Sequence, residues 1–318
     1  MQPRLSRNTT SVKAGVDAGF VIVRYVADKI KESGKGKIAF ITRSDAGIEA
    51  QIKNTAFTSP ELSLLQLRHI PQEASHFNKR QFGSYLESLA TFKALEGEAV
   101  IFASCESAAR ASIPAVINTR LNCYKLSYDD LIANLSLFGY ERVSCCTDIY
   151  QFAVRGSVVD FTRCAAVQGL GKDELCYRVD FLSDSPEAIF EFDIASQLRT
   201  AKVPKNINRY SGEPELNSPY ISPVCEVLNS KHTIITAKQS LQNICHQDEI
   251  EMLDHGIVGA NIAANYLQYF YQEPLSTLYD YLCDDDYVIF EAMPQEDIDK
   301  AMSLIKNKPN IITLSVLL

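Results

Sequence analysis

The segments LIANLSLFGYERV (131–143), YQFAVRGSVVDFTR (150–163) and CYRVDFLSDSPEAIFEFDIASQLRT (176–200) follow one another closely and decide the fold. The first is a helix pattern, with a capping-box signature from Ser127 to Asp130 before it and Gly139 placed to end it. The alternation that follows predicts short strands at 150–156, 158–163, 175–182 and 188–193, with turns at 169–171 and 183–186. Together these signals predict a small α+β module.

The strand at 175–182 has the period of two that sends alternate side chains to opposite faces of a sheet. Tyr177 and Phe181 are expected to face the core. Arg178 and Leu182 then lie on the outer face, where Leu182 is an apolar residue among polar ones.

Arg155 is expected to face outward from the strand at 150–156, and it joins Arg178 on one surface if the two strands are neighbours. Two arginines beside an exposed aliphatic group have the composition of a protein interface. The alternative is that the arginines are merely solvated and that a loop covers Leu182. The pattern alone favours neither.

Residues 1–118 and 203–318 alternate between helix and strand periods, which predicts an α/β fold with a largely parallel sheet shared by both parts. Ser44 or Asp45 is expected to cap the helix after the first strand. The predicted strands are 37–41, 99–103, 232–237, 287–291 and 311–316, and residues 62–67 are an apolar stretch. The predicted helices are 20–30, 81–94, one opening at Ser104, helices across 239–270, and 295–306.

The composition of the 318 residues indicates a globular protein, with 46% hydrophobic residues and a net charge of −8. An acidic chain with scattered Lys and Arg has no electrostatic footprint for nucleic acid, so weak or no autonomous DNA binding is expected. The nine cysteines include no CxxC pair, and no apolar run is long enough to cross a bilayer. We expect a soluble, cytoplasmic monomer without membrane contact.

Motifs for catalysis are absent from the sequence. A phosphate-binding loop needs Lys and Ser or Thr after its last glycine, whereas residues 12–20 read VKAGVDAGF. The five histidines are far apart in the sequence, no Gly-x-Ser-x-Gly elbow is present, and Glu291 at the end of a predicted strand is a commonplace feature. We therefore predict no catalytic residue, no cofactor and no metal, and a chain that is not an enzyme.

Four segments resemble the N-terminal region of bacterial transcription-repair coupling factors (Mfd), a region that is itself similar to the excision-repair protein UvrB. They are GYERV (139–143), VRGSVVDF (154–161), YRVDF (177–181) and FDIASQLRT (192–200), in the order and spacing of that family. The flanks resemble it at YLESL (85–89), AVIFAS (99–104) and YLQYFYQEPL (266–275). The resemblance covers nearly the whole chain and is strongest in the middle.

This resemblance implies a degenerate helicase or RecA-like lobe built from residues 1–118 and 203–318, with a UvrA-interaction module inserted at 119–202. It places the UvrA-binding surface on Arg155, Arg178 and Leu182, and Leu182 stands where the family has Phe. The polymerase-binding domain and the helicase motor of that family are not expected within these residues. The expected function is that of a non-enzymatic, UvrB-like adaptor that binds UvrA in transcription-coupled nucleotide excision repair.

Two alternatives stay open. The chain could be a DNA-contacting repair factor without ATPase activity that uses the same fold. It could also be a truncated or decayed coupling-factor fragment with no present role.

Overall fold

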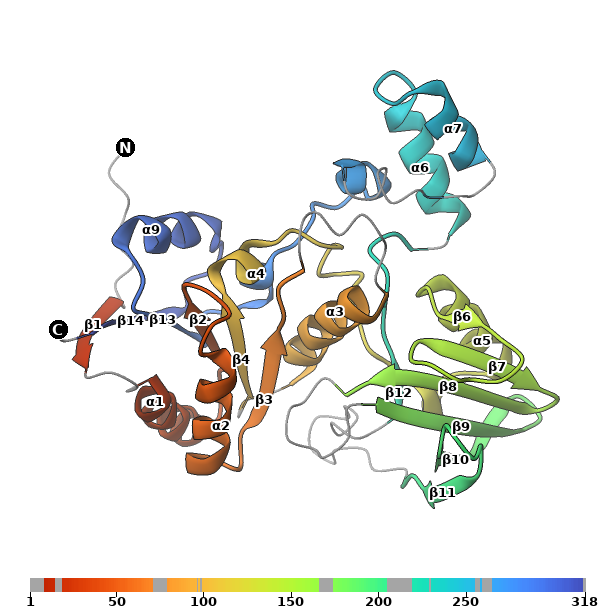
Figure 1. Cartoon of the computed structure of the whole chain (residues 1–318), viewed down its shortest axis with the longest axis horizontal. Coiled ribbons are helices and arrows are strands. Elements are labelled where there is room, and N and C mark those ends of the chain that lie inside the picture. The colour runs from red at the N-terminus through yellow and green to blue at the C-terminus, as the bar shows by residue number, and fades with distance from the viewer. Residues whose placement is uncertain are drawn as a thin grey trace.

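The computed structural model describes two six-stranded sheets that lie side by side and are joined by one long helix (Figure 1). The described residues are 9–14, 19–70, 79–95, 97, 99–165, 174–204, 219–228, 230–254, 258 and 265–316. We call the part built on the first sheet the lobe, and the part built on the second sheet the module.

The lobe sheet is entirely parallel, with the order β1-β14-β13-β2-β4-β3. Its strands are β1 (Thr9–Ala14), β2 (Ile38–Thr42), β3 (Ser63–Leu67), β4 (Ala99–Ser104), β13 (Tyr287–Glu291) and β14 (Asn310–Val316). The two last strands of the chain lie between β1 and β2, so the predicted sharing of one parallel sheet by both flanks is confirmed. The arrangement is consistent with a RecA-like lobe.

Helices cover both faces of the lobe sheet (Figure 1). The helices are α1 (Gly19–Ser33) and α2 (Ile48–Thr58) on one face, and α3 (Lys79–Ala94), α4 (Cys105–Ala109), α9 (Gln295–Leu304) and the 3-10 turn η3 (Leu278–Tyr281) on the other. Burial of Val23, Ala27 and Ile30 confirms the predicted inner side of α1, although Phe20 is only half-buried.

The module sheet has the order β11-β10-β9-β8-β7-β6 and is antiparallel except for the pair of β6 and β7. Its strands are β6 (Glu141–Arg142), β7 (Gln151–Arg155), β8 (Val158–Cys164), β9 (Glu174–Leu182), β10 (Ser185–Phe192) and β11 (Arg199–Lys202). The sequence predicted four of these six, and the two short ones at the edges carry little alternation. Residues 169–171, a predicted turn, lie outside the described residues.

The helix α5 (Tyr128–Leu137) covers the inner face of the module sheet and confirms the predicted caps. Ser127 Oγ accepts a hydrogen bond from the Asp130 N–H at 3.1 Å, and Gly139 after the helix has a φ of 93°. The connecting elements are β5 (Leu121–Asn122), the 3-10 turn η1 (Cys123–Lys125) and β12 (Tyr220–Ile221), which pairs with β5.

Two local predictions were wrong. Residues 232–237 form no strand but lie in α6 (Lys231–Leu241), where the Ser230 side chain caps the Thr233 N–H and burial recurs every four residues. Tertiary packing has overridden the strand propensity of a Thr-Ile-Ile-Thr run. The cap predicted at Ser44 or Asp45 is also wrong, because a turn intervenes and α2 begins after Gly47, which has a φ of 90°.

The helices α6 and α7 (Gln247–Asp254) form a pair that projects from the body of the molecule, beside the 3-10 turn η2 (Leu267–Phe270) (Figure 1). The prediction of helices over 239–270 is met by α7 and by the end of α6. Residues 255–257 and 259–264 lie outside the described part of the chain. The proposed domain boundaries at 118 and 202 stay predictions.

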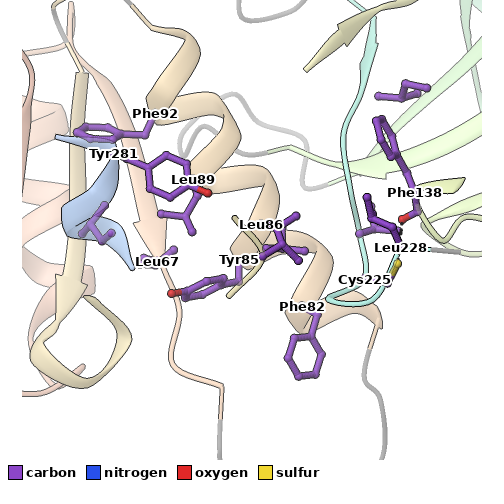
Figure 2. Close-up of a cluster of buried hydrophobic side chains, with 14 of the residues drawn as sticks. Leu67, Phe82, Tyr85, Leu86, Leu89, Phe92, Phe138, Cys225, Leu228 and Tyr281 are labelled. Carbon is purple, nitrogen blue, oxygen red and sulfur yellow. Dashed lines mark hydrogen bonds between the residues drawn. The ribbon is translucent and has the colours of Figure 1, made fainter. Parts of the chain in front are cut away.

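One continuous hydrophobic core passes from the lobe through α3 into the module. It includes Leu65 and Ile101 on the lobe side and Phe161 on the module side. Figure 2 shows side chains of α3 between Tyr281 on one side and Cys225 on the other. The two parts therefore share apolar packing instead of meeting as separate domains.

A buried ion pair crosses the same joint. Arg163 Nη1, from β8, lies 2.8 Å from Glu87 Oε1 on α3, and both side chains are at most 1% exposed. The Tyr150 hydroxyl donates a hydrogen bond to Glu87 Oε2 at 3.0 Å, and the Arg163 guanidinium lies 3.7 Å from the centre of the Tyr220 ring. Burial raises the pKa of the Glu87 carboxyl, and Arg163 beside it acts in the opposite direction. We call these four residues the junction cluster.

Gly83 is required for this packing. A Cβ atom at Gly83 would lie 2.3 Å from the Tyr150 ring, so only glycine lets the ring rest on the backbone of α3. Tyr150 itself has a φ of 60°, a conformation that a bulky residue adopts only where its surroundings enforce it. The unusual backbone of Tyr150 and the absence of a side chain at Gly83 together let the Tyr150 hydroxyl reach Glu87.

We predict that Arg163→Met destabilises the chain by about 3–5 kcal/mol, because it leaves the Glu87 carboxyl buried without its cation. A double variant with Glu87→Leu should be more stable than the single variant, since no buried charge then remains. Equilibrium urea unfolding measures both. The exposed pair of Arg80 and Glu174, 2.6 Å apart and also joining α3 to the module, is the control and should contribute at most about 1 kcal/mol. Additive losses at the buried pair would contradict this account.

Candidate docking face

The two faces of the module sheet are chemically different. Tyr177, Val179 and Phe181 are buried on the inner face, as the alternation predicted. The opposite side, which we call the outer face, carries Arg178 and Leu182. Leu182 is 69% exposed, so no loop covers it and the alternative reading of this residue is wrong.

The strands that carry Arg155 and Arg178 are not neighbours, because β8 lies between β7 and β9. The register pairs Ala153 of β7 with Asp160 of β8, and Asp160 with Arg178 of β9. Paired residues of antiparallel strands point to the same face. Asp160 therefore stands on the outer face between the two arginines.

Asp160 binds both arginines. Its Oδ1 accepts a hydrogen bond from Arg178 Nε at 2.7 Å and its Oδ2 accepts one from Arg178 Nη2 at 2.9 Å, a bidentate geometry. Arg155 Nη2 forms an ion pair with the same Oδ2. The Asp160 side chain is fully buried, and its hydrogen bonds raise the pKa of Arg178. The structure thus brings two of the three predicted residues together through a carboxylate that the sequence analysis missed.

The two arginines differ in exposure. The Arg155 side chain is 45% exposed, whereas that of Arg178 is 12% exposed. Arg178 also donates from Nη1 to the Gln197 backbone oxygen at 3.2 Å and lies over the Phe192 ring, 5.2 Å from its centre. Arg178 is therefore enclosed by its own chain, and Arg155 presents more of its surface to solvent.

Gln197 holds the far side of this enclosure. Its φ of 61° is left-handed, and its Nε2 donates to the backbone oxygens of Cys146 at 2.9 Å and Ile194 at 2.7 Å. Cys146 packs with Ala153 and Phe192 in a small apolar cluster on the outer face. Hydrogen bonds from Gln197 and apolar packing around Cys146 therefore hold the edge of the outer face near Arg178.

A second ion pair lies across β9 and β11. Asp180 Oδ2 is 2.7 Å from Arg199 Nη2, and the Arg199 guanidinium lies 4.4 Å from the centre of the Phe190 ring. The neighbouring Leu198 is 67% exposed. The outer face therefore carries the exposed Leu182 together with charges of both signs, a surface that can bind a partner with carboxylates and apolar side chains.

The sequence holds part of the information needed to find Asp160 and Leu198, which the sequence analysis missed. Asp160 is on the polar phase of its strand, as is Arg178, so strand order was the missing information. Leu198 lies in a turn where alternation says nothing. Within the described residues, no group of His, Cys, Asp and Glu could hold a metal ion, and none of their helices is long and apolar enough to span a membrane.

Comparison with known proteins locates this face within a described domain. Residues 123–208 match the model of the UvrB interaction domain. A curated transcription-repair-coupling factor from Rickettsia bellii (strain RML369-C) is 27% identical over 177 residues, which is 55% of this chain and 14% of that protein. Arg155, Asp160, Arg178 and Leu182 all fall inside the matched domain. The chain thus carries a UvrB interaction domain and is similar to the N-terminal region of a transcription-repair coupling factor.

Proposed function

We propose that this chain is a non-enzymatic adaptor that binds UvrA through the outer face of the module and so acts in nucleotide excision repair. The observation that carries the proposal is the exposed Leu182 on the same sheet face as the half-exposed Arg155, inside the region that matches the UvrB interaction domain. An exposed aliphatic group next to an arginine is typical of protein contacts. The similarity to a coupling factor supports the repair role.

The contacts have different expected strengths. Arg155 can give its exposed donors to a partner carboxylate, which is a charge-assisted contact. Leu182 can bury its side chain, and its smaller area than the Phe of the resembling family costs about 1 kcal/mol of burial. We therefore expect recognition by an arginine and an aliphatic side chain on one sheet face, with weaker apolar anchoring.

The lobe supports a scaffold role and not nucleotide hydrolysis. Glu291, at the end of β13, accepts a hydrogen bond from Gln51 Nε2 at 3.0 Å, and its Oε1 lies 2.5 Å from where a Cβ of Gly19 would be. Gly19 is the first residue of α1, and a helix start is where phosphate groups bind in nucleotide-binding α/β proteins. A carboxylate beside this position disfavours a phosphate electrostatically.

We predict that Arg155→Ala weakens UvrA binding by roughly ten- to hundredfold, the usual loss at an interface arginine. Arg178→Ala should also weaken it, because the enclosure around Asp160 is lost. Leu182→Phe should hold or tighten binding, since it restores aromatic area. Isothermal titration calorimetry with UvrA from the same organism measures the three dissociation constants.

Arg24→Ala is the matched control, because Arg24 is 47% exposed and ion-paired with Asp28 on the lobe helix α1. It should leave UvrA affinity unchanged. Absence of binding by the unmodified chain at micromolar concentration would refute the adaptor role. An equal loss from Arg24→Ala would show that the outer face is not the contact.

We also predict no measurable ATP binding or hydrolysis in the presence of Mg²⁺. The physical reason is the missing lysine and hydroxyl after Gly19 together with the Glu291 carboxylate. Calorimetric titration with ATP should give only heats of dilution. Micromolar affinity would overturn the non-enzymatic reading of the lobe.

A further inference from the structure

We infer that Asp160 is a positioning residue, which fixes the side chains of Arg155 and Arg178 in the free chain and so preorganises the outer face for a carboxylate-bearing partner. The inference rests on the proposed function in its choice of partner. The Asp160 side chain has no exposed surface, so it cannot itself contact a partner, and its role is to hold the two arginines.

The geometry supports a fixed arrangement. Asp160 lies on the strand between the two arginine-bearing strands, and both of its carboxylate oxygens are engaged. A buried carboxylate needs cationic partners and hydrogen bonds, since burying a charge without them is costly. The ion pairs with the buried Asp160 carboxylate therefore hold each arginine side chain in place, whether or not a partner is present.

The arrangement divides the work between the arginines. Arg178 is closed in by Asp160, the Gln197 backbone oxygen and the Phe192 ring, and it holds the carboxylate in place. Arg155 shares the same carboxylate but stays 45% exposed, so it is the arginine that meets the partner. Arg155 is a long side chain that would otherwise lose rotamer freedom on binding.

A positioning role and a purely electrostatic role predict opposite changes in UvrA affinity when Asp160 is replaced by Asn. Arg155, Arg178 and Asp160 together carry a net charge of +1, and Asp160→Asn raises it to +2. If the arginines acted only as charges, this variant would attract an acidic partner more strongly. If Asp160 positions them, the variant binds more weakly despite its larger positive charge.

The test is calorimetric titration of the full chain with UvrA at several KCl concentrations. We expect Asp160→Asn to bind roughly tenfold more weakly, the loss anticipated when rotamer-rich side chains must be ordered on binding. Asp254→Asn is the control, because it removes one negative charge from an exposed ion pair with Lys238 on the α6 and α7 pair. It should change affinity less than twofold. Equal or tighter binding by Asp160→Asn would overturn the inference.

Asp160→Asn changes a buried site and could lose affinity by misfolding, so a second variant at the half-exposed Arg155 is also tested. Arg155→Lys keeps the charge at a half-exposed position but replaces the planar fork with a flexible ammonium. The positioning account predicts a several-fold loss of UvrA affinity. Unchanged affinity for this variant would contradict it.

A readout on the free chain separates this inference from the proposed function. In NMR spectra the Nε–H signal of Arg178 and the Nη–H signals of Arg155 should be ordered and slow to exchange in the unmodified chain, and should broaden or exchange faster in Asp160→Asn. If UvrA does not bind at all, the adaptor proposal falls while these signals still decide what Asp160 does. Identical signals in both proteins would refute the positioning role.

Discussion

The buried contact between Glu87 and Arg163 fixes how the module meets the lobe. A carboxylate on the central lobe helix and a guanidinium on a module strand are both removed from water, so each requires the other in place. The Tyr150 hydroxyl and the Tyr220 ring complete the surroundings of the pair, and Gly83 admits the Tyr150 ring. This directional contact adds orientation to an apolar core that alone would tolerate sliding.

The strand β8 carries this constraint to the outer face. Arg163 points inward to Glu87, whereas Asp160, three residues earlier, points outward to Arg155 and Arg178. An odd spacing on a strand places two charges on opposite faces, and each is neutralised by residues of its own face. The same strand thus anchors the module to the lobe and organises the surface that we propose meets UvrA. Displacing β8 at the junction would disturb both.

Sequence patterns predicted what depends on local periodicity and capping. The caps of α5 at Ser127 and Gly139 and the inward side of β9 follow from rules that need no tertiary information. The strand order could not be predicted, so the separation of β7 from β9 and the bridging role of Asp160 were missed. Alternation places Arg163 on the apolar side of its strand, where an arginine is unexpected. Its partner Glu87 lies far away in the sequence, so the buried ion pair could not be predicted. Residues 232–237 were misassigned because burial on the helix outweighs the strand propensity of β-branched residues.

Amide hydrogen exchange of the whole chain, with and without UvrA, tests most directly whether the outer face of the module is the contact surface for UvrA. We expect slower amide exchange on binding in peptides that cover β7, the turn after it and the end of β9 at Leu182, with α1 and α6 unaffected. Protection confined to the lobe or to the α6 and α7 pair, with the module unchanged, would contradict it.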